Sequence, residues 1–379
     1  MRATRALIHL DNFNNNVIEI QKRIGSGVRL CASLKADAYG HGAIEIASAG
    51  LKAGISCLGV ASVQEGEILR KSGITAPILL FSQTLPEEIP EIIENKLCPL
   101  VSDCEFIKML DEAASAAGIR LPVHLKIDTG MGRMGCSVQE TPVLAHMIAS
   151  SAALDYAGTA THLAVSDSAD PGDIMFTRHQ IAVFTGALDS IRAAGINPGI
   201  IHAGNSGAVI LHPEAWFDMV RPGILLYGYK TTEETADLAL PPLQVKPVME
   251  LRSNVVLIKQ ILKGTPVSYG RTWVAEHDTA IGILPVGYAD GLPRLAGSSW
   301  QAVINGRSYP LAGRICMDQC MVDLGPNNGT GQNVRRWDEA VLFGGPAPGA
   351  DSLAALTGTI PYEITCNINK RVPRVYVTG

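Results

Sequence analysis

Lys35 is the residue whose position most strongly suggests chemistry, because it directly follows the apolar run 30–34. A lysine at the edge of a protein interior loses hydration, which lowers the pKa of its ammonium group and supplies the neutral amine that Schiff-base formation needs. The alternative is a lysine that extends its amine into water at the end of a strand. The segment Tyr39-Gly-His-Gly42 favours the first interpretation, because glycines beside a tyrosine and a histidine let the backbone approach a ligand.

A second group of small and polar residues follows two later apolar runs, in Gly204-Asn-Ser206-Gly207 and Gly223-Ile224. Such segments commonly bind phosphate through backbone N–H groups and a hydroxyl. Together with the amine of Lys35 they predict a phosphorylated cofactor that also reacts with an amine, and pyridoxal 5′-phosphate (PLP) has both properties. A Schiff-base aldolase without a cofactor is the alternative, but it leaves the turn at 204–207 unexplained if its substrate lacks phosphate.

Arg221 bears on the type of reaction. Enzymes that use PLP as a strong electron sink usually place Asp or Glu against the pyridine nitrogen. An arginine does not give up its proton, so at that place it would keep the ring nitrogen unprotonated. The electron pair would then be less delocalised into the ring, and reprotonation of the wrong carbon would be suppressed. A surface salt bridge is the alternative for this residue.

The elements that must position these residues alternate between strands and helices from residue 11 to residue 228. A capping box at Ser62–Glu65 and a helix over Cys104–Ala117, opened by Ser102-Asp103 and closed by Gly118, are the clearest helix signals. The alternation predicts a closed (β/α)₈ barrel, with a doubly wound open sheet as the alternative, and barrels place reactive residues after the strands. The expected strands are Arg29–Leu34, Cys57–Ala61, Ile78–Phe81, Cys98–Val101, Val123–Ile127, Tyr156–Thr161, Gly199–His202 and Met219–Leu225.

The alternation of apolar runs and helical patterns stops at the polar segment Tyr229–Pro242, and such a segment is typical of a domain junction. Beyond it, short apolar runs bounded by Gly and Pro predict an all-β region. These runs are Val245–Ile261, Thr279–Leu284, Ala302–Ile304, Met321–Leu324 and Ala340–Phe343. We therefore expect a barrel over residues 11–237 and a β-rich domain over residues 238–379, joined by an N-terminal strand within residues 1–10.

Composition excludes several classes of protein. The 379 residues include 31 basic and 36 acidic side chains, for a net charge of −5, and no basic run, so we expect no nucleic-acid partner. We also expect no membrane span and no signal peptide, because His9 and Asp11 interrupt the N-terminal apolar residues. The eight scattered cysteines predict reduced thiols in a cytoplasmic protein, and Cys316 and Cys320 lack the partners of a zinc site, so we expect no metal.

The chain resembles the alanine racemases, PLP-dependent enzymes of fold type III that interconvert L- and D-alanine. The resemblance runs from residue 33 to residue 376 in the expected order and spacing. Its motifs are Ser33-Leu-Lys-Ala-Asp-Ala-Tyr-Gly-His-Gly42, Lys126-Ile-Asp-Thr-Gly-Met-Gly-Arg-Met-Gly135, Thr161-His162, His202-Ala-Gly-Asn-Ser206, Val220-Arg-Pro-Gly-Ile-Leu-Leu-Tyr-Gly228, Val267-Ser-Tyr-Gly-Arg-Thr-Trp273, Leu284-Pro-Val-Gly-Tyr-Ala-Asp-Gly-Leu-Pro-Arg294, Gly313-Arg-Ile-Cys-Met-Asp-Gln319 and Val372-Pro-Arg-Val-Tyr376.

The resemblance implies a homodimer with shared active sites. Lys35 would carry the cofactor and act as one base, and Tyr269 of the partner subunit would be the second base on the opposite face. Racemisation requires two such bases, because one removes the α-proton and the other supplies a proton from the far side. Arg221 would face the pyridine nitrogen. The other residues implied to hold the cofactor are Tyr39, His162, Ser206, Gly223, Ile224 and Tyr362.

The resemblance also implies residues around the substrate. Arg133 and the backbone N–H of Met317 would bind the substrate carboxylate, and His202 would support Arg221. Lys126 matches a lysine that many members carry as a carbamate, which would place a negative charge beside the arginine. The enzyme would supply D-alanine for peptidoglycan or serve alanine catabolism. The entryway would be lined by Asp167, Tyr288, Arg294, Arg314 and Ile360.

Three other classes of PLP-binding protein remain as alternatives. A serine-preferring racemase of the same family is disfavoured by Tyr362, whose ring would crowd a larger substrate side chain. A fold-type-III decarboxylase would carry an acidic residue where Arg221 stands. A non-catalytic PLP carrier of the single-barrel kind would lack residues 243–379 and Tyr269.

Overall fold

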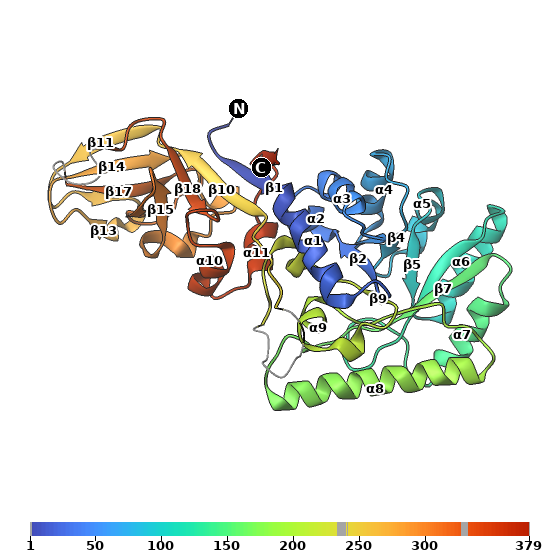
Figure 1. The fold of residues 1–379 in the computed structure, drawn as a ribbon. Helices are drawn as coiled ribbons and strands as arrows, with labels where there is room; N and C mark the ends of the chain where they lie inside the picture. Colours follow the sequence, from blue (N-terminus) through green and yellow to red (C-terminus); the bar gives the residue numbers. More distant parts are fainter. Residues whose placement is uncertain (1, 233–239, 241, 327–332, 379) are drawn as a thin grey trace. The chain divides into compact units, whose positions relative to one another are not determined.

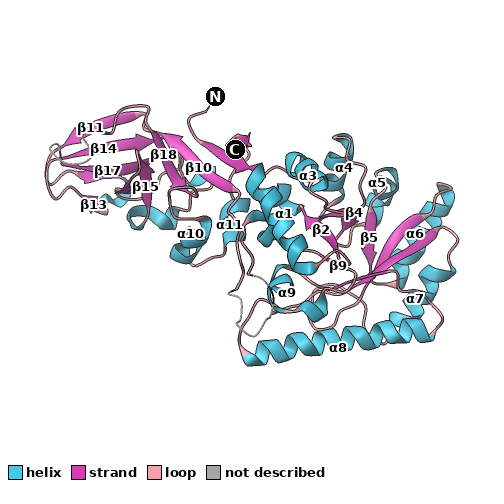
Figure 2. Ribbon diagram, in the orientation of Figure 1, coloured by secondary structure: helices cyan, strands magenta, loops and turns pink. Residues whose placement is uncertain are grey.

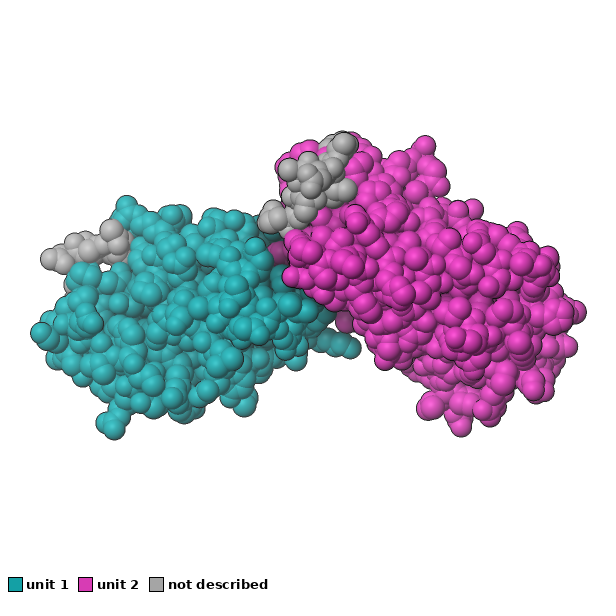
Figure 3. Space-filling model, turned by 90° about the horizontal axis from the view of Figure 1, so that it is seen from below, with its two compact units in different colours: residues 1–12, 39–42, 247–379 teal, residues 13–38, 43–246 magenta. Residues whose placement is uncertain are grey.

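The structure is a computed structural model that describes residues 2–232, 240, 242–326 and 333–378 (Figure 1). The chain divides into two compact units, which Figure 3 shows in separate colours. The barrel unit holds residues 13–38 and 43–246, and the β unit holds residues 1–12, 39–42 and 247–379. The domain boundary that the sequence predicts, between residues 237 and 238, lies outside the described residues.

The barrel unit contains an eight-stranded sheet in which every strand pairs in parallel with its neighbours. The two end strands are also joined, because the N–H of Asp218 donates to the carbonyl of Ile201 (3.0 Å) and that of Arg221 to Gly204 (2.8 Å). The predicted closed barrel is confirmed. Its strands are β2 (Arg29–Ser33), β3 (Cys57–Val60), β4 (Ile78–Leu80), β5 (Cys98–Val101), β6 (Leu121–Lys126), β7 (Leu154–Ala160), β8 (Ile200–His202) and β9 (Met219–Val220).

Helices surround these strands (Figure 2). The predicted capping box is confirmed at the start of α4, where Ser62 Oγ accepts from the N–H of Glu65 and the Glu65 carboxylate accepts from that of Ser62. Asp103 caps α6 as expected. The helices are α1 (Leu10–Ile24), α3 (Ala43–Lys52), α4 (Val63–Lys71), α5 (Ile89–Glu94), α6 (Cys104–Ala116), α7 (Thr141–Ser150), α8 (Pro171–Ala193) and α9 (Ser206–Leu211), with 3₁₀ turns η1 (Pro86–Glu88) and η2 (Pro213–Ala215).

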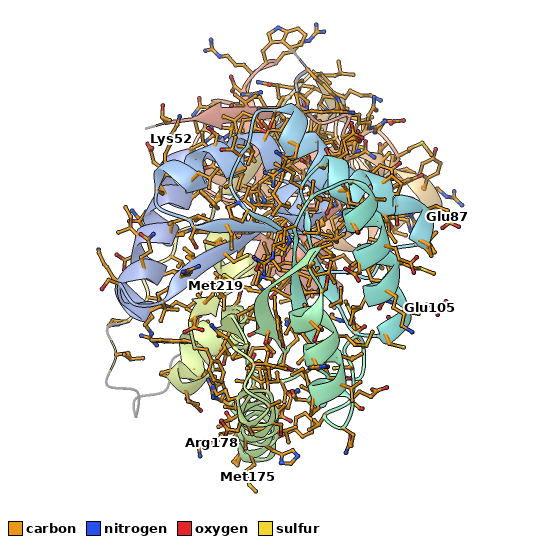
Figure 4. The ribbon with its side chains drawn as sticks, turned by 90° about the vertical axis from the view of Figure 1, so that its right-hand side faces the viewer. Lys52, Glu87, Glu105, Met175, Arg178 and Met219 are labelled. Carbon is orange, nitrogen blue, oxygen red and sulfur yellow. The ribbon has the colours of Figure 1, made fainter. Side chains whose placement is uncertain are left out.

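Small and sulfur-containing side chains fill part of the barrel interior. Cys31, Cys57 and Cys98 pack with Leu79, Leu100, Ala160 and Met219. In Figure 4 Met219 lies inside the ring of helices, whereas Lys52 and Glu105 stand on its outside. All eight cysteines of the chain are free thiols. Among the described residues, no helix is both long and apolar enough to cross a bilayer.

One strand prediction is wrong at its end. The sequence predicts a strand over Met219–Leu225, but β9 ends at Val220 and a 3₁₀ turn, η3 (Ile224–Tyr227), follows. Pro222 has no N–H to donate to a neighbouring strand, and the N–H of Gly223 donates instead to Ser206 Oγ (2.9 Å). The turn is buried, which is why its apolar sequence resembles a strand.

The β unit is mainly β, as predicted, and the run Val245–Ile261 forms two strands. The N-terminal strand β1 (Arg5–His9) pairs with β10 and with β19. The six-stranded sheet has the order β16-β15-β18-β10-β1-β19, beside the sheets β11-β14-β17 and β12-β13. The further strands are β10 (Met249–Asn254), β11 (Leu257–Ile261), β12 (Pro266–Val267), β13 (Trp273–Val274), β14 (Thr279–Leu284), β15 (Gln301–Ile304), β16 (Arg307–Pro310), β17 (Cys320–Pro326), β18 (Glu339–Phe343) and β19 (Arg374–Val377).

The all-β expectation for this region misses its short helices. They are α10 (Ala350–Thr357) and α11 (Pro361–Cys366), with 3₁₀ turns η4 (Tyr269–Arg271), η5 (Tyr288–Asp290) and η6 (Arg294–Ser299). None is longer than eight residues, which is too short for a helical period to stand out from the surrounding strands.

Candidate active site

Lys35 is followed by a left-handed turn. Ala36, Asp37 and Ala38 have φ of 53 to 55° and ψ of 48 to 51°, and Tyr39 has φ of 54°, so the segment α2 (Lys35–Tyr39) is not an ordinary helix. Each residue with a Cβ costs roughly 1–2 kcal/mol in this conformation. Such strain persists only where surrounding contacts fix the backbone, and it is common at functional sites.

The contacts that fix this turn come from carboxylates. Glu65 of α4 accepts hydrogen bonds from the N–H groups of Ala36 (2.6 Å) and Ala61 (2.8 Å). Asp37 accepts from the N–H of Ala43 at the start of α3 (2.8 Å). The sequence identifies Glu65 only as a capping residue. The structure shows that it also positions the backbone beside Lys35.

We expect Glu65→Ala to lower the free energy of unfolding by about 2 kcal/mol, because the backbone N–H groups of Ala36, Ala61 and Ser62 lose a charged acceptor. Urea unfolding followed by circular dichroism measures the loss. Glu67→Ala on the same helix is the matched control: it removes only the ion pair with Lys71 (2.6 Å), worth about 0.3–0.5 kcal/mol. Equal losses in the two variants would show that the turn does not depend on Glu65.

The loops after β8 and β9 bring together Ser206, Gly223 and Ile224. Ser206 Oγ accepts from the N–H groups of Gly223 (2.9 Å) and Leu225 (3.4 Å). Beside it, Gly207 has no room for a side chain, because a Cβ there would lie 2.7 Å from the nitrogen of Asp167. The hydroxyl of Ser206 and the neighbouring backbone N–H groups therefore lie close together, as in a site that could bind a small anion.

Arg221 is buried and all its hydrogen bonds go to neutral groups. Its guanidinium lies 2.7 Å from His202 Nδ1 and 3.4 Å from His162 Nδ1, and it donates to the carbonyls of Thr161 (2.8 Å) and Ala203 (3.1 Å). Burial lowers the pKa of Arg221 to about 10, so it remains protonated at neutral pH. These partners exclude the surface salt bridge that the sequence left open.

His162 lies among positive charges. Burial lowers its pKa well below the usual value, and the charges of Lys126, Arg221, Arg133 and Lys35 lower it further. The structure therefore brings four of the predicted cationic residues to the same end of the barrel. A concentration of positive charge in a partly buried site favours an anionic ligand.

Lys126 is the last residue of β6, and Arg133 lies in the loop that follows it. Burial, followed by the charges of Arg221 and Arg133, lowers the pKa of Lys126 well below the usual value. Asp128 organises the loop by accepting from the N–H groups of Gly130 (2.9 Å) and Gly132 (3.0 Å). The guanidinium of Arg133 is exposed at the end of this loop in the single chain.

Gln180 of α8 is a buried residue that the sequence does not single out. Its Nε2 donates to the carbonyl of His162 (3.1 Å) and to Thr129 Oγ1 (3.4 Å), and its Oε1 accepts from the N–H of Ala164 (2.9 Å). It therefore ties the loops after β6 and β7 together. A single glutamine within a long helix carries no sequence signal for this role, because its partners are set by tertiary structure.

In the β unit, Tyr269 occupies a strained turn. Ser268, Gly270 and Arg271 have positive φ of 68°, 73° and 49°. Ser268 Oγ donates to the carbonyl of Arg314 (2.6 Å), which fixes the turn. The side chain of Tyr269 is 69% exposed in the single chain. It borders a groove of about 520 Å³, whose lining includes Ser268 and Cys316.

Met317 and Tyr288 lie together in the same unit. The N–H of Tyr288 donates to the carbonyl of Cys316 and that of Ala289 to Met317, each at 3.0 Å. Gly287 permits this approach, because a Cβ there would lie 2.2 Å from the Cys316 oxygen.

The remaining predicted residues divide between the units. The rings of Tyr39 and Tyr362, both in the β unit, have centroids 5.8 Å apart. All five predicted entryway residues are exposed: Tyr288, Arg294, Arg314 and Ile360 in the β unit and Asp167 in the barrel unit. No group of three or more His, Cys, Asp or Glu side chains in the described part of the chain could hold a metal ion.

Both halves of the chain match the same enzyme family. Residues 8–231 match the alanine racemase N-terminal domain, and residues 248–376 match the alanine racemase C-terminal domain. The chain belongs to the alanine racemase family. It is therefore an amino-acid racemase, which is an isomerase.

Individual alanine racemases are similar over the full chain. One from Treponema denticola is 50% identical over 383 residues, which cover 100% of this chain and 99% of the relative. One from Treponema pallidum is 44% identical over 385 residues, with 100% of both chains covered. The solved alanine racemase of Clostridium difficile 630 superimposes with a TM-score of 0.92 at 34% identity, covering 100% of this chain and 97% of that one. That of Streptomyces lavendulae gives 0.90 at 35%, covering 100% and 98%.

Proposed function

We propose that this protein racemises alanine with PLP as its cofactor and with Lys35 and Tyr269 of the partner subunit as the two bases. The observation that carries the proposal is the convergence of Lys35, Lys126, Arg133 and Arg221 on His162. A site with this charge suits a ligand that brings several negative charges, as a phosphorylated cofactor and an amino-acid carboxylate together do.

The residues present fit the cofactor. The hydroxyl of Ser206 and the N–H groups of Gly223 and Ile224 are the donors that a phosphate ester needs, and Lys35 supplies an amine. We assign Tyr39 and Tyr362 as further phosphate ligands and His162 as a neighbour of the ring. When bound, PLP accepts the electron pair that remains on the substrate Cα after the proton leaves.

Arg221 would hold the pyridine nitrogen unprotonated, because a guanidinium offers only N–H donors. Its hydrogen bonds to His202 and to the Thr161 and Ala203 carbonyls leave it little freedom to move away. Limited delocalisation into the ring keeps reprotonation at Cα, which favours racemisation. A decarboxylase of the same fold type would need an acidic residue at this place.

The two bases would act from opposite faces. Lys35 Nζ exchanges a proton with Cα on one face, and Tyr269 Oη of the partner subunit does so on the other. The high exposure of Tyr269 in the single chain and the groove beside it support a homodimer in which each subunit completes the site of the other.

Arg133 and the N–H of Met317 would bind the substrate carboxylate. The lowered pKa of Lys126 provides the neutral amine that carbamylation requires, and a carbamate there would pair with Arg133. We propose that substrate passes Asp167, Tyr288, Arg294, Arg314 and Ile360 on its way in.

The ring of Tyr362, packed near Tyr39, favours alanine over serine as substrate. Eight free thiols are typical of a reducing compartment, which supports a cytoplasmic enzyme. There it would provide D-alanine for the cell wall or take part in alanine catabolism.

Incubation of the protein with L-alanine in heavy water tests the proposal. We expect D-alanine to appear with deuterium at Cα, because the proton that returns comes from a solvent-exchanged base. Chiral chromatography with mass spectrometry measures both products, and a carbon dioxide assay excludes decarboxylation. D-alanine that retains its original α-hydrogen throughout would contradict the two-base mechanism.

A further inference from the structure

His124 of β6 lies directly behind His202, and neither the sequence motifs nor the proposed function uses it. Its Nδ1 is 2.7 Å from His202 Nε2, and the two rings meet edge to face with centroids 4.9 Å apart. His202 Nδ1 is in turn 2.7 Å from a guanidinium nitrogen of Arg221. The three side chains form one buried row that ends at the group assigned to the pyridine nitrogen.

The chemistry of the groups allows one arrangement of protons along this row. A guanidinium only donates, so His202 Nδ1 must accept. Burial lowers the pKa of His202 well below the usual value and that of His124 to about 3, so both rings are neutral. The proton of His202 is therefore on Nε2, and it is donated to Nδ1 of His124.

The backbone reserves space for the imidazole of His124. Gly158 of β7 is its register partner, and a Cβ at that glycine would lie 2.4 Å from His124 Nδ1 and 2.5 Å from Cε1. The pairing of β6 with β7 also shifts register between Val123 and His124. The absence of a side chain at Gly158 leaves the space in which the ring of His124 reaches the ring of His202.

We propose that His124 is a positioning residue that fixes His202 as the Nε2–H tautomer and thereby holds Arg221 in place. Without the acceptor on His124, the Nε2–H of His202 is buried without a partner, and only Arg221 still opposes a shift of the proton to Nδ1. In the shifted form two donors face each other, and the guanidinium loses one of its anchors. The consequence for the cofactor rests on the proposed function, whereas the tautomer itself does not.

The first test reads the tautomer directly. Nitrogen-15 NMR of the holoenzyme labelled at histidine distinguishes protonated from unprotonated ring nitrogens, and His202→Gln identifies the signals of His202. We expect wild-type His202 to carry its proton on Nε2 alone. A proton on Nδ1 of His202 in the wild-type protein would overturn the proposal, whether or not the His124 variants fold.

Two substitutions of His124 then distinguish the effect of its hydrogen-bond acceptor from the effect of its side-chain volume. His124→Asn puts an amide oxygen at the place of Nδ1, whereas His124→Leu fills similar volume without an acceptor. We expect His124→Leu to give His202 some Nδ1–H form, to change the visible spectrum of bound PLP and to lower kcat by on the order of tenfold to a hundredfold. His124→Asn should restore the tautomer, the spectrum and most of the rate.

Leu110→Ala, in the buried face of α6, controls for lost stability, and we expect it to lower Tm without changing the His202 signals. Equal impairment of His124→Asn and His124→Leu, or an unchanged tautomer in His124→Leu, would overturn the role of His124. A wild-type protein without cofactor absorbance or racemisation would instead refute the proposed function, and the NMR result would still decide the tautomer.

Discussion

Lys35→Ala is expected to lack the absorbance of a lysine–PLP Schiff base and to racemise alanine at least about a thousandfold more slowly than wild type. The substitution removes both the amine that would bind the cofactor covalently and one of the two bases, and loss of a general base alone costs about 10²–10⁴-fold. Visible absorbance of the purified protein and a coupled D-alanine assay measure the two effects.

The control for this experiment must show that another lysine cannot take over. Lys126 is the relevant rival, because it is buried among the same charges and its pKa is lowered. Lys126→Ala should therefore remain yellow, even if its rate falls through Arg133. Lys52→Ala, on the outer side of α3, should be normal in both measurements (Figure 4). A Lys35→Ala protein that still carried PLP covalently, as borohydride reduction followed by mass spectrometry would show, would refute the assignment.

The barrel could be predicted because the same sequence pattern recurs for each strand. Each strand is a short apolar run, and polar or glycine-rich residues follow it where a barrel places its active site. The prediction failed after Val220, where an apolar sequence forms a buried 3₁₀ turn instead of a strand. Periodicity cannot separate these two structures over so few residues, because both are fully buried.

The residues of the candidate site and the support of Arg221 by His202 were predicted from the motifs, but the roles of His124 and Gln180 were not. His124 lies within the apolar strand 121–126 and resembles a core position. Its role depends on His202, 78 positions away in the chain. The role of Gln180 depends in the same way on its hydrogen bonds to the loops after β6 and β7, which come close to α8 only in the folded chain. Tertiary contacts of this kind leave no local pattern in a single sequence.

The left-handed turn after Lys35 was also beyond prediction. Sequence reasoning places positive φ at glycine, and Ala36-Asp-Ala38 contains none. The conformation is imposed by hydrogen bonds that the carboxylates of Glu65 and Asp37 accept from backbone N–H groups, rather than by the intrinsic preference of the residues. Strain that the fold imposes on ordinary residues is visible only in the structure.

Tyr269→Phe is expected to separate the two directions of proton transfer. Removing the hydroxyl deletes the base on one face, taken to be the face that serves L-alanine, and should slow that transfer by about 10²–10⁴-fold. Net racemisation must fall equally in both directions, because the equilibrium constant between enantiomers is one. Exchange of the α-proton with heavy water is therefore the informative measurement, and D-alanine should still exchange through Lys35 while L-alanine does not.

Mixed dimers then test whether the tyrosine acts across subunits. In a heterodimer of Lys35→Ala and Tyr269→Phe chains, one site receives both mutant residues and the other receives Lys35 and Tyr269 intact. Random reassociation of equal amounts should therefore restore about one quarter of wild-type activity from two nearly inactive proteins. Tyr156→Phe, which removes a hydroxyl 3.0 Å from Thr159 in the barrel unit, controls for the substitution itself. If mixing restored nothing although the dimers exchange subunits, each site would have to use the tyrosine of its own chain.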